Sequence, residues 1–430
     1  MKSLSYSRLL LTVAFVASAS LGACATNDVT LGGPATLVRV DPEAPGLTCA
    51  TGGTAIHTGL DRDGDTFLDD DEIASTQYVC NGATLLQCEG GVIKTGPIAV
   101  RTNAELATLA GVHCIDGDLL IAGVTADSLS NLADLTVVTG DLVIVANPAI
   151  TSLQGLEQLH IVGGTMLLQG NDALADLTGL TSFRSASSLS LVGNNALTSL
   201  TGLEDLHEFA GSLRIANNAA LASLQGLDNL ATCHGTLTLR GNNSLTSLAG
   251  LANLRDIKLL EIAGNKALTT ASLPLLQKID VRLLITDNST LTRLAVPMLV
   301  TTGDFIRIDN NPLLSQIDAG MLVTTAGLNM TGDAALTTLN LPNLTFVTGG
   351  FDVRNMSKLA TVAAPQLTSV GTDVTFDTLP ALLDFAGLSG LRNVGGNLTI
   401  SNNKAPQAVC QQFANRLAVS GTVTVRNNGL

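Results

Sequence analysis

The 430-residue sequence is poor in aromatic rings and in charge: it has no tryptophan, 3% aromatic residues and only 13% charged residues. Hydrophobic residues reach 46%, which excludes an intrinsically disordered chain, because such chains combine low hydrophobicity with high charge. Basic residues are scarce as well, with 22 Lys and Arg against 36 Asp and Glu. An acidic chain without a basic face has no electrostatic reason to bind nucleic acid.

The start of the chain has the features of an export signal. Lys2 and Arg8 precede the apolar run LLLTVAFVASASLGA, which ends in small residues before Cys24. A charged start, a short apolar segment and small residues at its end are typical of a secretory signal peptide. The run is too short and too rich in Ser and Ala to favour a membrane span.

The end of this run, Leu21-Gly22-Ala23-Cys24, resembles a bacterial lipobox, whose cysteine is diacylated and becomes the mature N-terminus. The resemblance implies lipidation at Cys24 and anchoring to a membrane, since each buried methylene contributes roughly 0.8 kcal/mol. It also favours the outer membrane, because Ala25 stands where an Asp would indicate inner-membrane retention. The alternatives are an ordinary signal peptide with an incidental cysteine and, for the anchored protein, either the cell surface or the periplasm.

A strongly acidic segment follows a polar tether. DRDGDTFLDDDE, residues 61–72, carries seven acidic residues in twelve, which repel one another unless a cation is present. Numbered as an EF-hand-like loop, it predicts a Ca²⁺ site with ligands from Asp61, Asp63, Asp65, the Phe67 carbonyl, Asp69 and Glu72. The pattern departs from an EF-hand at Thr66, where the sharp turn usually requires Gly, and a solvated acidic turn is the alternative.

The stretch TLVRVDPEAPGLTCATGGTAIHTGLDRDGDTFLDDDEIASTQYVCNG resembles a short module, bracketed by cysteines, that recurs in secreted myxobacterial proteins. The resemblance implies a disulfide between Cys49 and Cys80, which an oxidising compartment permits. The calcium ion would then be structural, holding together a domain too small to build its own core.

Most of the remaining chain is one repeat of about 23 residues, with the pattern L-x-I-x-x-N-x-x-L-x-x-L-x-G-L-x-x-L. Its asparagine column, in which all spacings lie between 22 and 25 residues, consists of Asn147, Asn171, Asn194, Asn218, Asn242, Asn265, Asn288, Asn311, Asp333, Met356, Leu379, Asn403 and Asn428, with Val124 as a degenerate first member. Each unit has a period-2 segment, such as 142–144, followed by apolar residues at every third position. This alternation of a short strand with a tight arc predicts a mainly β, right-handed parallel β-solenoid of about 14 coils.

The asparagine column is expected to be structural, since an inward amide at each corner can satisfy backbone groups of its own coil and the next. At Met356 and Leu379 we expect apolar side chains to fill the corner instead. The beginning of the repeats, AVRTNAELATLAGVHCIDGDLLIAG, resembles that of receptor L domains, of leucine-rich repeats related to them, and of fungal GPI-anchored cell-wall organisation proteins. This resemblance implies a solenoid that binds or organises rather than catalyses.

The remaining cysteines fit caps and a core. Cys88 and Cys114 flank the first coil and are expected to form a disulfide, whereas Cys233 and Cys410 lie about seven coils apart and are expected to be separate buried thiols. The sequence therefore predicts this organisation: signal peptide 1–24, tether 25–37, calcium-loop module 38–84, N-terminal cap 85–112, solenoid repeats 113–404, and a C-terminal helical cap with the last coil, 405–430.

The outward positions of the strands are the candidate binding surface. In the early coils they are apolar, which is unusual for an exposed sheet face, and they comprise Leu120, Val143, Val145, Leu167 and Val192. These residues are predicted to contact a protein or glycan partner, unless the calcium-loop module or the cap covers them. Later coils place charged residues on the same face.

Sequence motifs of catalysis are missing. The chain has no G-x-S-x-G motif and no phosphate-binding glycine loop, and its coils lack the long insertions that would build a cleft. Asp309 and Asp352 share the sheet face but lie two coils apart beside Arg307 and Arg354, an arrangement that suits cross-strand ion pairing better than glycan hydrolysis. The sequence therefore predicts a non-catalytic, lipid-anchored envelope protein for recognition or adhesion, or alternatively a structural component without a discrete ligand.

Overall fold

The computed structural model describes residues 36–43, 53–60, 68–69, 72–80, 88 and 90–429. These residues fall into two compact units, which divide between residues 85 and 86. The first unit is an antiparallel sheet of β1 (Thr36–Glu43), β2 (Gly53–Leu60) and β3 (Ile73–Cys80), in the order β1-β2-β3. The second unit contains the repeats. No helix in the described ranges is long and apolar enough to cross a bilayer.

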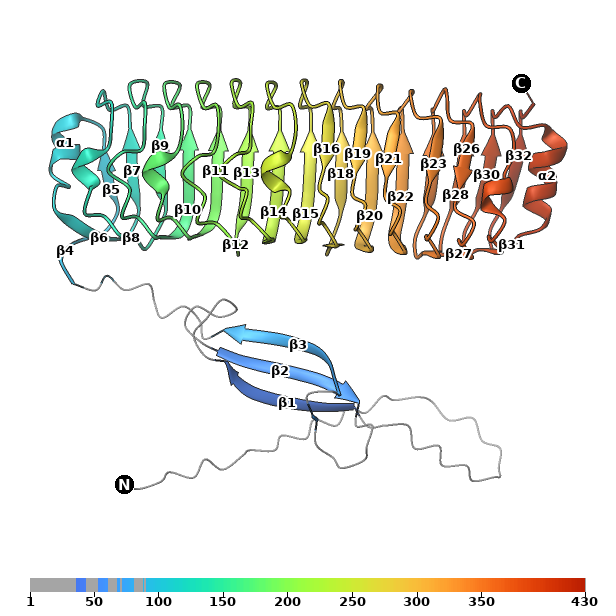
Figure 1. The fold of residues 1–430 in the computed structure, drawn as a ribbon, viewed down its shortest axis with the longest axis horizontal. Coiled ribbons are helices and arrows are strands. Elements are labelled where there is room, and N and C mark those ends of the chain that lie inside the picture. Colours follow the sequence, from blue (N-terminus) through green and yellow to red (C-terminus); the bar gives the residue numbers. More distant parts are fainter. Residues whose placement is uncertain are drawn as a thin grey trace. The chain divides into compact units, whose positions relative to one another are not determined.

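The second unit is a parallel β-solenoid, as the repeat predicted (Figure 1). Its main sheet takes one strand from each coil: β5 (Ile98–Val100), β7 (Leu119–Ala122), β9 (Leu142–Val145), β10 (Ile161–Gln169), β11 (Ser185–Val192), β13 (Ser212–Ala216), β14 (Thr232–Arg240), β15 (Asp256–Ala263), β18 (Leu283–Thr286), β20 (Thr301–Asp309), β22 (Thr324–Thr331), β25 (Phe351–Arg354), β28 (Val374–Asp377), β30 (Leu398–Ser401) and β32 (Val423–Arg426). Within residues 90–429 these are fifteen strands, so the solenoid has about 15 coils rather than about 14. The additional coil lies in the stretch 85–112, where β5 pairs with β7 in parallel.

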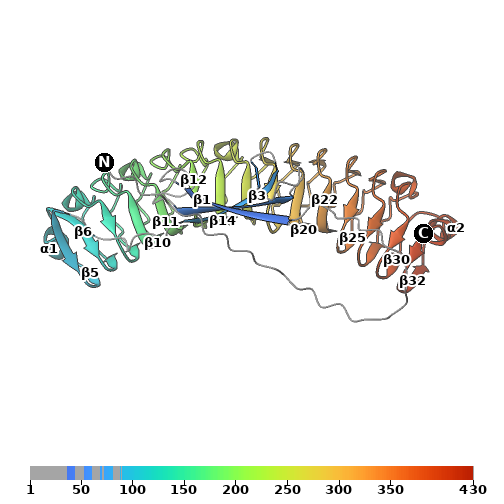
Figure 2. The ribbon, with the colours of Figure 1, turned by 90° about the horizontal axis from the view of Figure 1, so that it is seen from below.

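Shorter strands extend the sheet at the preceding corner: β4 (Val92–Thr95), β6 (Val112–Asp116), β8 (Val137–Val138), β12 (Glu208–Phe209), β17 (Lys278–Ile279), β24 (Phe346–Val347), β27 (Ser369–Val370), β29 (Asn393–Val394) and β31 (Ala418–Val419). On the opposite side, some coils add three-residue strands, namely β16 (Thr270–Ser272), β19 (Arg293–Ala295), β21 (Gln316–Asp318), β23 (Thr338–Asn340) and β26 (Thr361–Ala363). The repeat unit bows gently, and its main sheet lies along the concave side (Figure 2).

The core is a continuous aliphatic column inside the coils. In one coil, Leu142 and Ile144 point inward from the strand, and Leu153, Leu156 and Leu159 follow at every third position of the arc, all of them completely buried. Leu142 and Ile144 both point inward because side chains alternate between the two sides of a strand. The three-residue spacing of the leucines that follow reflects the tight turn of the arc. Since every coil repeats this arrangement, each one packs on its two neighbours and none forms a core alone.

The corner after each main strand is held by a ladder of side-chain amides. The corner ladder consists of Asn147, Asn171, Asn194, Asn218, Asn242, Asn265, Asn288, Asn311 and Asp333, all fully buried. At a typical rung, the Asn171 backbone N–H donates to Asn194 Oδ1 at 3.0 Å, and Asn171 Nδ2 donates to the Ile144 carbonyl at 2.8 Å. The ladder thus satisfies backbone groups at a bend where no strand can do so, which confirms its structural role. Met356 and Leu379 fill the next two corners and are also fully buried, as expected.

Both ends of the solenoid carry a helix. At the N-terminal end, α1 (Asn103–Ala107) has a capping box in which Thr102 and Glu105 bond each other's backbone N–H groups. At the C-terminal end, α2 (Gln407–Asn415) lies within the expected cap, and Gln407 Nε2 donates to the Val425 carbonyl of β32 at 2.9 Å. The helices thereby cover core surface that the terminal coils would otherwise expose.

Candidate functional site

The outward face of the main sheet is the surface that sequence patterning singled out. Because side chains alternate along a strand, the residues that flank the inward Leu142 and Ile144 point away from the core. Val143 and Val145 accordingly lie outward and are half-buried. The parallel register then aligns equivalent positions of successive coils into columns on this face.

The five apolar residues predicted for partner binding do share this face. Leu120 pairs with Val143, and Val143 with Leu167, so these three form an unbroken column. In the neighbouring column, Gln169 lies between Val145 and Val192 and interrupts the apolar surface. All five residues are half-buried within their own unit. The apolar face patch, defined by these five residues, is therefore a real feature of the early coils.

Charged residues of the later coils pair on the same face, but not across strands as expected. Arg307 bonds Asp309 and Arg354 bonds Asp352, the latter at 2.5 Å, so each pair lies along one strand. The expected cross-strand pairing is wrong because the strand between them, β22, places Asn329 and Thr331 in the intervening register positions. Arg240 and Glu261, at 3.4 Å, do pair between neighbouring strands of this face.

Two groups on this face have shifted pKa values. The hydrogen bond that the Arg354 guanidinium donates to Asp352 raises the pKa of Arg354, and the carboxylate's charge adds to this effect. Burial alone would raise the pKa of Asp377, but hydrogen bonds from Ser401, Asn402 and Thr378 lower it overall. Both shifts favour the ionised form of the group.

The three-stranded unit contains a polar network that the sequence analysis did not identify. Arg39 donates to Asp41 at 2.7 Å and to the Leu68 carbonyl at 2.7 Å. His57 bonds Thr76 at 2.8 Å and lies 3.4 Å from the Asp41 carboxylate. Part of the signal was present in the sequence, because Arg39 and Asp41 are two residues apart and therefore lie on one face of the first strand. The position of His57 beside Arg39 follows from the strand register.

Of the six predicted calcium ligands, four lie outside the described residues: Asp61, Asp63, Asp65 and Phe67. The other two are neighbours on one turn, in which the Glu72 backbone N–H donates to the Asp69 carbonyl at 3.1 Å and Glu72 Oε2 accepts from the Asp69 N–H at 3.3 Å. Glu72 is 4% exposed. Among the described residues alone, no three His, Cys, Asp or Glu side chains come together in a metal-binding arrangement.

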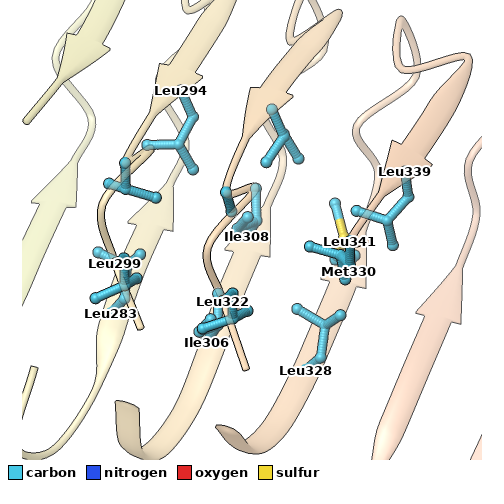
Figure 3. Close-up of a pocket in the computed structure, with 13 residues that line it drawn as sticks. Leu283, Leu294, Leu299, Ile306, Ile308, Leu322, Leu328, Met330, Leu339 and Leu341 are labelled. Atoms are coloured by element: carbon cyan, nitrogen blue, oxygen red, sulfur yellow. The ribbon is translucent and has the colours of Figure 1, made fainter. Parts of the chain in front are cut away.

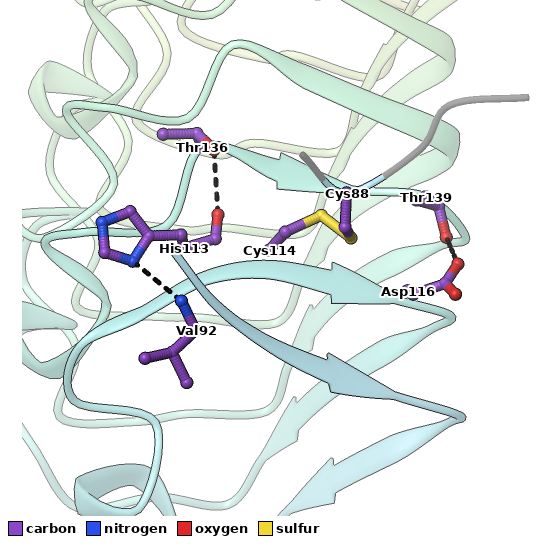
Figure 4. Close-up of a disulfide and its surroundings, with 7 residues drawn as sticks. All are labelled: Cys88, Val92, His113, Cys114, Asp116, Thr136 and Thr139. Carbon is purple, nitrogen blue, oxygen red and sulfur yellow. Dashed lines mark hydrogen bonds between the residues drawn. A yellow bond between two sulfur atoms is a disulfide. The ribbon is translucent and has the colours of Figure 1, made fainter. Parts of the chain in front are cut away.

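The cysteines of the solenoid behave as expected. Cys88 and Cys114 form a disulfide beside the first strands of the solenoid (Figure 4). Cys233 and Cys410 are separate buried thiols, and burial raises the pKa of each. Cys24 and Cys49 lie outside the described residues, as does the side chain of Cys80.

A small apolar cavity lies inside the solenoid, between the coils of β18, β20 and β22 (Figure 3). It has a volume of about 20 Å³, and its lining includes Leu283, Ile308, Leu328, Met330 and Leu339. Because a single water needs about 10–15 Å³ and several polar partners, this cavity is a packing defect rather than a ligand site.

The second unit is a β-solenoid with leucine-rich-repeat-like patterning. Residues 36–80 match a family described as "Domain of unknown function (DUF7151)". Among solved structures, a chain in "Crystal structure of TLR13-ssRNA13 complex" is similar at 15% identity and a TM-score of 0.22, with 75% of this chain and 58% of that chain covered. The chain thus spans less than two thirds of that protein. A search of curated proteins finds no match.

Proposed function

We propose that this protein is a lipid-anchored, non-catalytic recognition or adhesion protein of a cell envelope, which presents the concave sheet face to a protein or glycan. The observation that carries the proposal is the apolar face patch. Outward positions of an exposed sheet are normally polar, and contiguous apolar surface commonly marks an interaction site. The resemblance of the repeats to receptor L domains supports the same function.

Lysine substitutions on the face test this proposal. The double variant Val143→Lys with Leu167→Lys places two charges in the apolar face patch, and the matched control Thr399→Lys with Thr424→Lys places them on the same face near the other end. Binding of the purified proteins to protein and glycan arrays is measured, with circular dichroism as a check of folding. Loss of binding in the first variant alone supports the proposal. Equal binding by both variants contradicts it, and unfolding of the first shows that the patch is internal.

The alternative is a structural envelope component without a discrete ligand, which the great regularity of the coils also fits. Protease treatment of intact cells, followed with an antibody against the solenoid, separates the two. Digestion without lysis supports recognition or adhesion at the surface. Protection until the outer membrane is ruptured favours the structural role in the periplasm.

Lipid anchoring at Cys24 is the second part of the proposal. We expect the chain with Cys24→Ser to leave the membrane fraction and to take up no labelled fatty acid, because the variant has no thiol to acylate. The matched control is Cys233→Ser, whose thiol lies in the solenoid core. Membrane retention of the Cys24→Ser protein would contradict the assignment.

Calcium binding by the first unit is the third part. The acidic stretch of residues 61–72 supports it, because closely spaced carboxylates on a looping backbone supply the hard oxygen ligands that Ca²⁺ prefers. We expect Ca²⁺ to raise the melting temperature of the wild-type unit and Glu72→Gln to abolish the rise. Calorimetric titration that detects no heat of binding to the wild-type chain would contradict it.

A further inference from the structure

The corner ladder contains one carboxyl among its amides, at Asp333. The Asn311 backbone N–H donates to Asp333 Oδ1 at 2.9 Å, and Asn311 Nδ2 donates to the same oxygen at 3.1 Å. Asp333 Oδ1 therefore accepts the same two bonds as the amide oxygen of most other rungs, such as Asn311 Oδ1, which accepts from the Asn288 backbone N–H and from Asn288 Nδ2. The fold at this corner is unchanged, and the side chain is fully buried.

The second carboxyl oxygen of Asp333, Oδ2, differs from the amide nitrogen that the asparagine rungs carry at the same place. At the preceding rungs the amide nitrogen donates to a strand carbonyl one coil back, as Asn311 Nδ2 does to the Ile285 carbonyl at 3.0 Å. Asp333 Oδ2 occupies the place of that nitrogen and is buried without a hydrogen-bond partner among the described residues. By the repeat register, the carbonyl one coil back is that of Ile308 in β20. An ionised oxygen is repelled by a carbonyl, whereas a protonated one can donate to it.

Within the described residues, the hydrogen bonds from Asn311 are the interactions that offset a negative charge on Asp333. On the preceding coil lie the Asn311 amide and the Asp309 carboxylate, which is itself paired with Arg307 and has a second buried oxygen without a partner in the described chain. On the following coil the corner is filled by the Met356 side chain. Burial raises the pKa of Asp333 to about 7; hydrogen bonds from Asn311 oppose this rise and the Asp309 charge adds to it.

We propose that Asp333 is a proton-dependent rung: protonated, it completes the corner ladder, and ionised, it loosens the solenoid between β20 and β25. The following corners amplify the effect, because Met356 and Leu379 contribute no amide to replace the lost bonds. The apolar cavity lined by Ile308 and Met330 lies in the same coils, so packing there is also less complete. If the protein lies in the cell envelope, as proposed above, a change in external pH would loosen its solenoid at this one position along its length.

The direction of the effect follows from linkage. An aspartate has a pKa near 3.9 in the unfolded chain, so the folded state holds its proton more tightly. The stabilising contribution is therefore complete below about pH 4 and is lost as the pH rises through the folded pKa near 7. Between these limits, the equilibrium constant for local opening should rise by up to about tenfold per pH unit.

Hydrogen exchange of residues 305–357 at pH 5 to 8, corrected for the intrinsic pH dependence of exchange, tests the proposal. In the wild-type protein, protection of the Asn311 and Asp333 corners should fall across this range and then level off. Asp333→Asn, which restores an amide rung, should remove the pH dependence. An identical pH profile in wild type and Asp333→Asn would overturn the proposal.

A second variant keeps the proposal testable if Asp333→Asn fails to fold. Asn242→Asp places a carboxyl in a rung flanked by amides on both sides, Asn218 and Asn265. It should introduce a new pH-dependent loss of protection at its own corner and leave the Asp333 corner as in wild type. No pH dependence at the new carboxyl would contradict the mechanism.

Discussion

At the scale of single residues, the corner after each main strand from β7 to β32 contains two consecutive positions with different requirements. The second carries an inward side chain, in most coils a rung of the corner ladder, and the first has a positive φ, which L-residues adopt at a cost of about 1–2 kcal/mol. Most coils place glycine, asparagine or aspartate at this first position, since these residues tolerate the left-handed region. Ala146 and Thr378 are the exceptions, with φ of 51° and 57°.

Thr378 is the more strained of the two, because β-branched residues are the least compatible with a positive φ. We expect Thr378→Asn to raise the free energy of unfolding by about 1 kcal/mol, since asparagine occupies the equivalent position in neighbouring coils such as Asn355 and Asn402. Urea unfolding measures the change. The control Thr399→Asn, in an extended strand, should give no gain, and destabilisation by Thr378→Asn would refute the strain argument.

The amide rungs themselves should be costly to remove. Asn242→Ala would leave the Asn218 backbone N–H and the Ile215 carbonyl buried without their partners. At about 1–3 kcal/mol for each such group, we expect a loss of roughly 3 kcal/mol. Thermal unfolding checks this against Asn243→Ala, an exposed neighbour that should change little. Equal losses in both variants would mean that the ladder adds no stability.

The sequence predicted this column correctly, residue by residue, from its spacing alone. It could not reveal that Asp333 lacks a partner for one oxygen, because aspartate and asparagine fit the repeat pattern equally well. Their difference appears only when the partners of each oxygen and nitrogen are counted in three dimensions.

At the scale of elements, the C-terminal cap is joined to the core by aromatic contacts. Phe376 packs against Phe351 and Phe385, with ring centroids 5.6 Å and 5.3 Å apart. Phe385 stacks on Phe413 of α2 at 4.3 Å, and Arg416 lies over the Phe413 ring at 4.8 Å. In a chain so poor in rings, this cluster fixes where the solenoid ends.

Removal of the outermost ring should therefore release the helix. We expect Phe413→Ala to destabilise the cap by about 3–5 kcal/mol, because the ring is almost fully buried against Phe385. Limited proteolysis should then cleave within α2, followed by exposure of the last coil. Gln412→Ala, on the exposed side of the same helix, is the matched control and should resist proteolysis like wild type. Resistance of Phe413→Ala would show that the aromatic contacts are dispensable.

The sequence predicted the helix of the C-terminal cap but not the helix of the N-terminal cap. The C-terminal helix was expected within 405–420 and spans Gln407–Asn415. The N-terminal helix was not expected, although its capping box, Thr102 to Glu105, is visible in the sequence. A helix of five residues is too short to show a helical repeat of apolar residues, and the coil that carries it lacks a ladder residue. The sequence pattern therefore did not predict this helix.

At the scale of the whole molecule, each coil of the solenoid pairs with its immediate neighbours, so local damage should stay local. The Cys88–Cys114 disulfide closes a span of 26 residues at one end. By chain entropy it contributes about 3 kcal/mol to the terminal coil.

The fold class, the repeat boundaries and the core positions could be predicted from the sequence, because they depend on the repeat of about 23 residues. The ion-pair geometry on the open sheet face could not be predicted, because it does not depend on this repeat.

The double variant Cys88→Ser with Cys114→Ser should therefore unfold from one end. We expect faster hydrogen exchange in β4–β7, and exchange rates in β28–β32 that match wild type, because the intervening coils separate the two ends. Addition of a reductant to wild type should give the same pattern. A single cooperative loss of protection along the entire solenoid would contradict nearest-neighbour stabilisation.

The corner ladder also has a direction. From Asn147 to Asn311, the backbone N–H of each rung donates to the side chain of the rung that follows it in the sequence. During synthesis N-terminal coils emerge first, so the corner of each coil lacks its acceptor until the next coil has arrived. This direction predicts that the coils fold in order from the N-terminal end, and that each new coil completes the hydrogen bonds of the one before it.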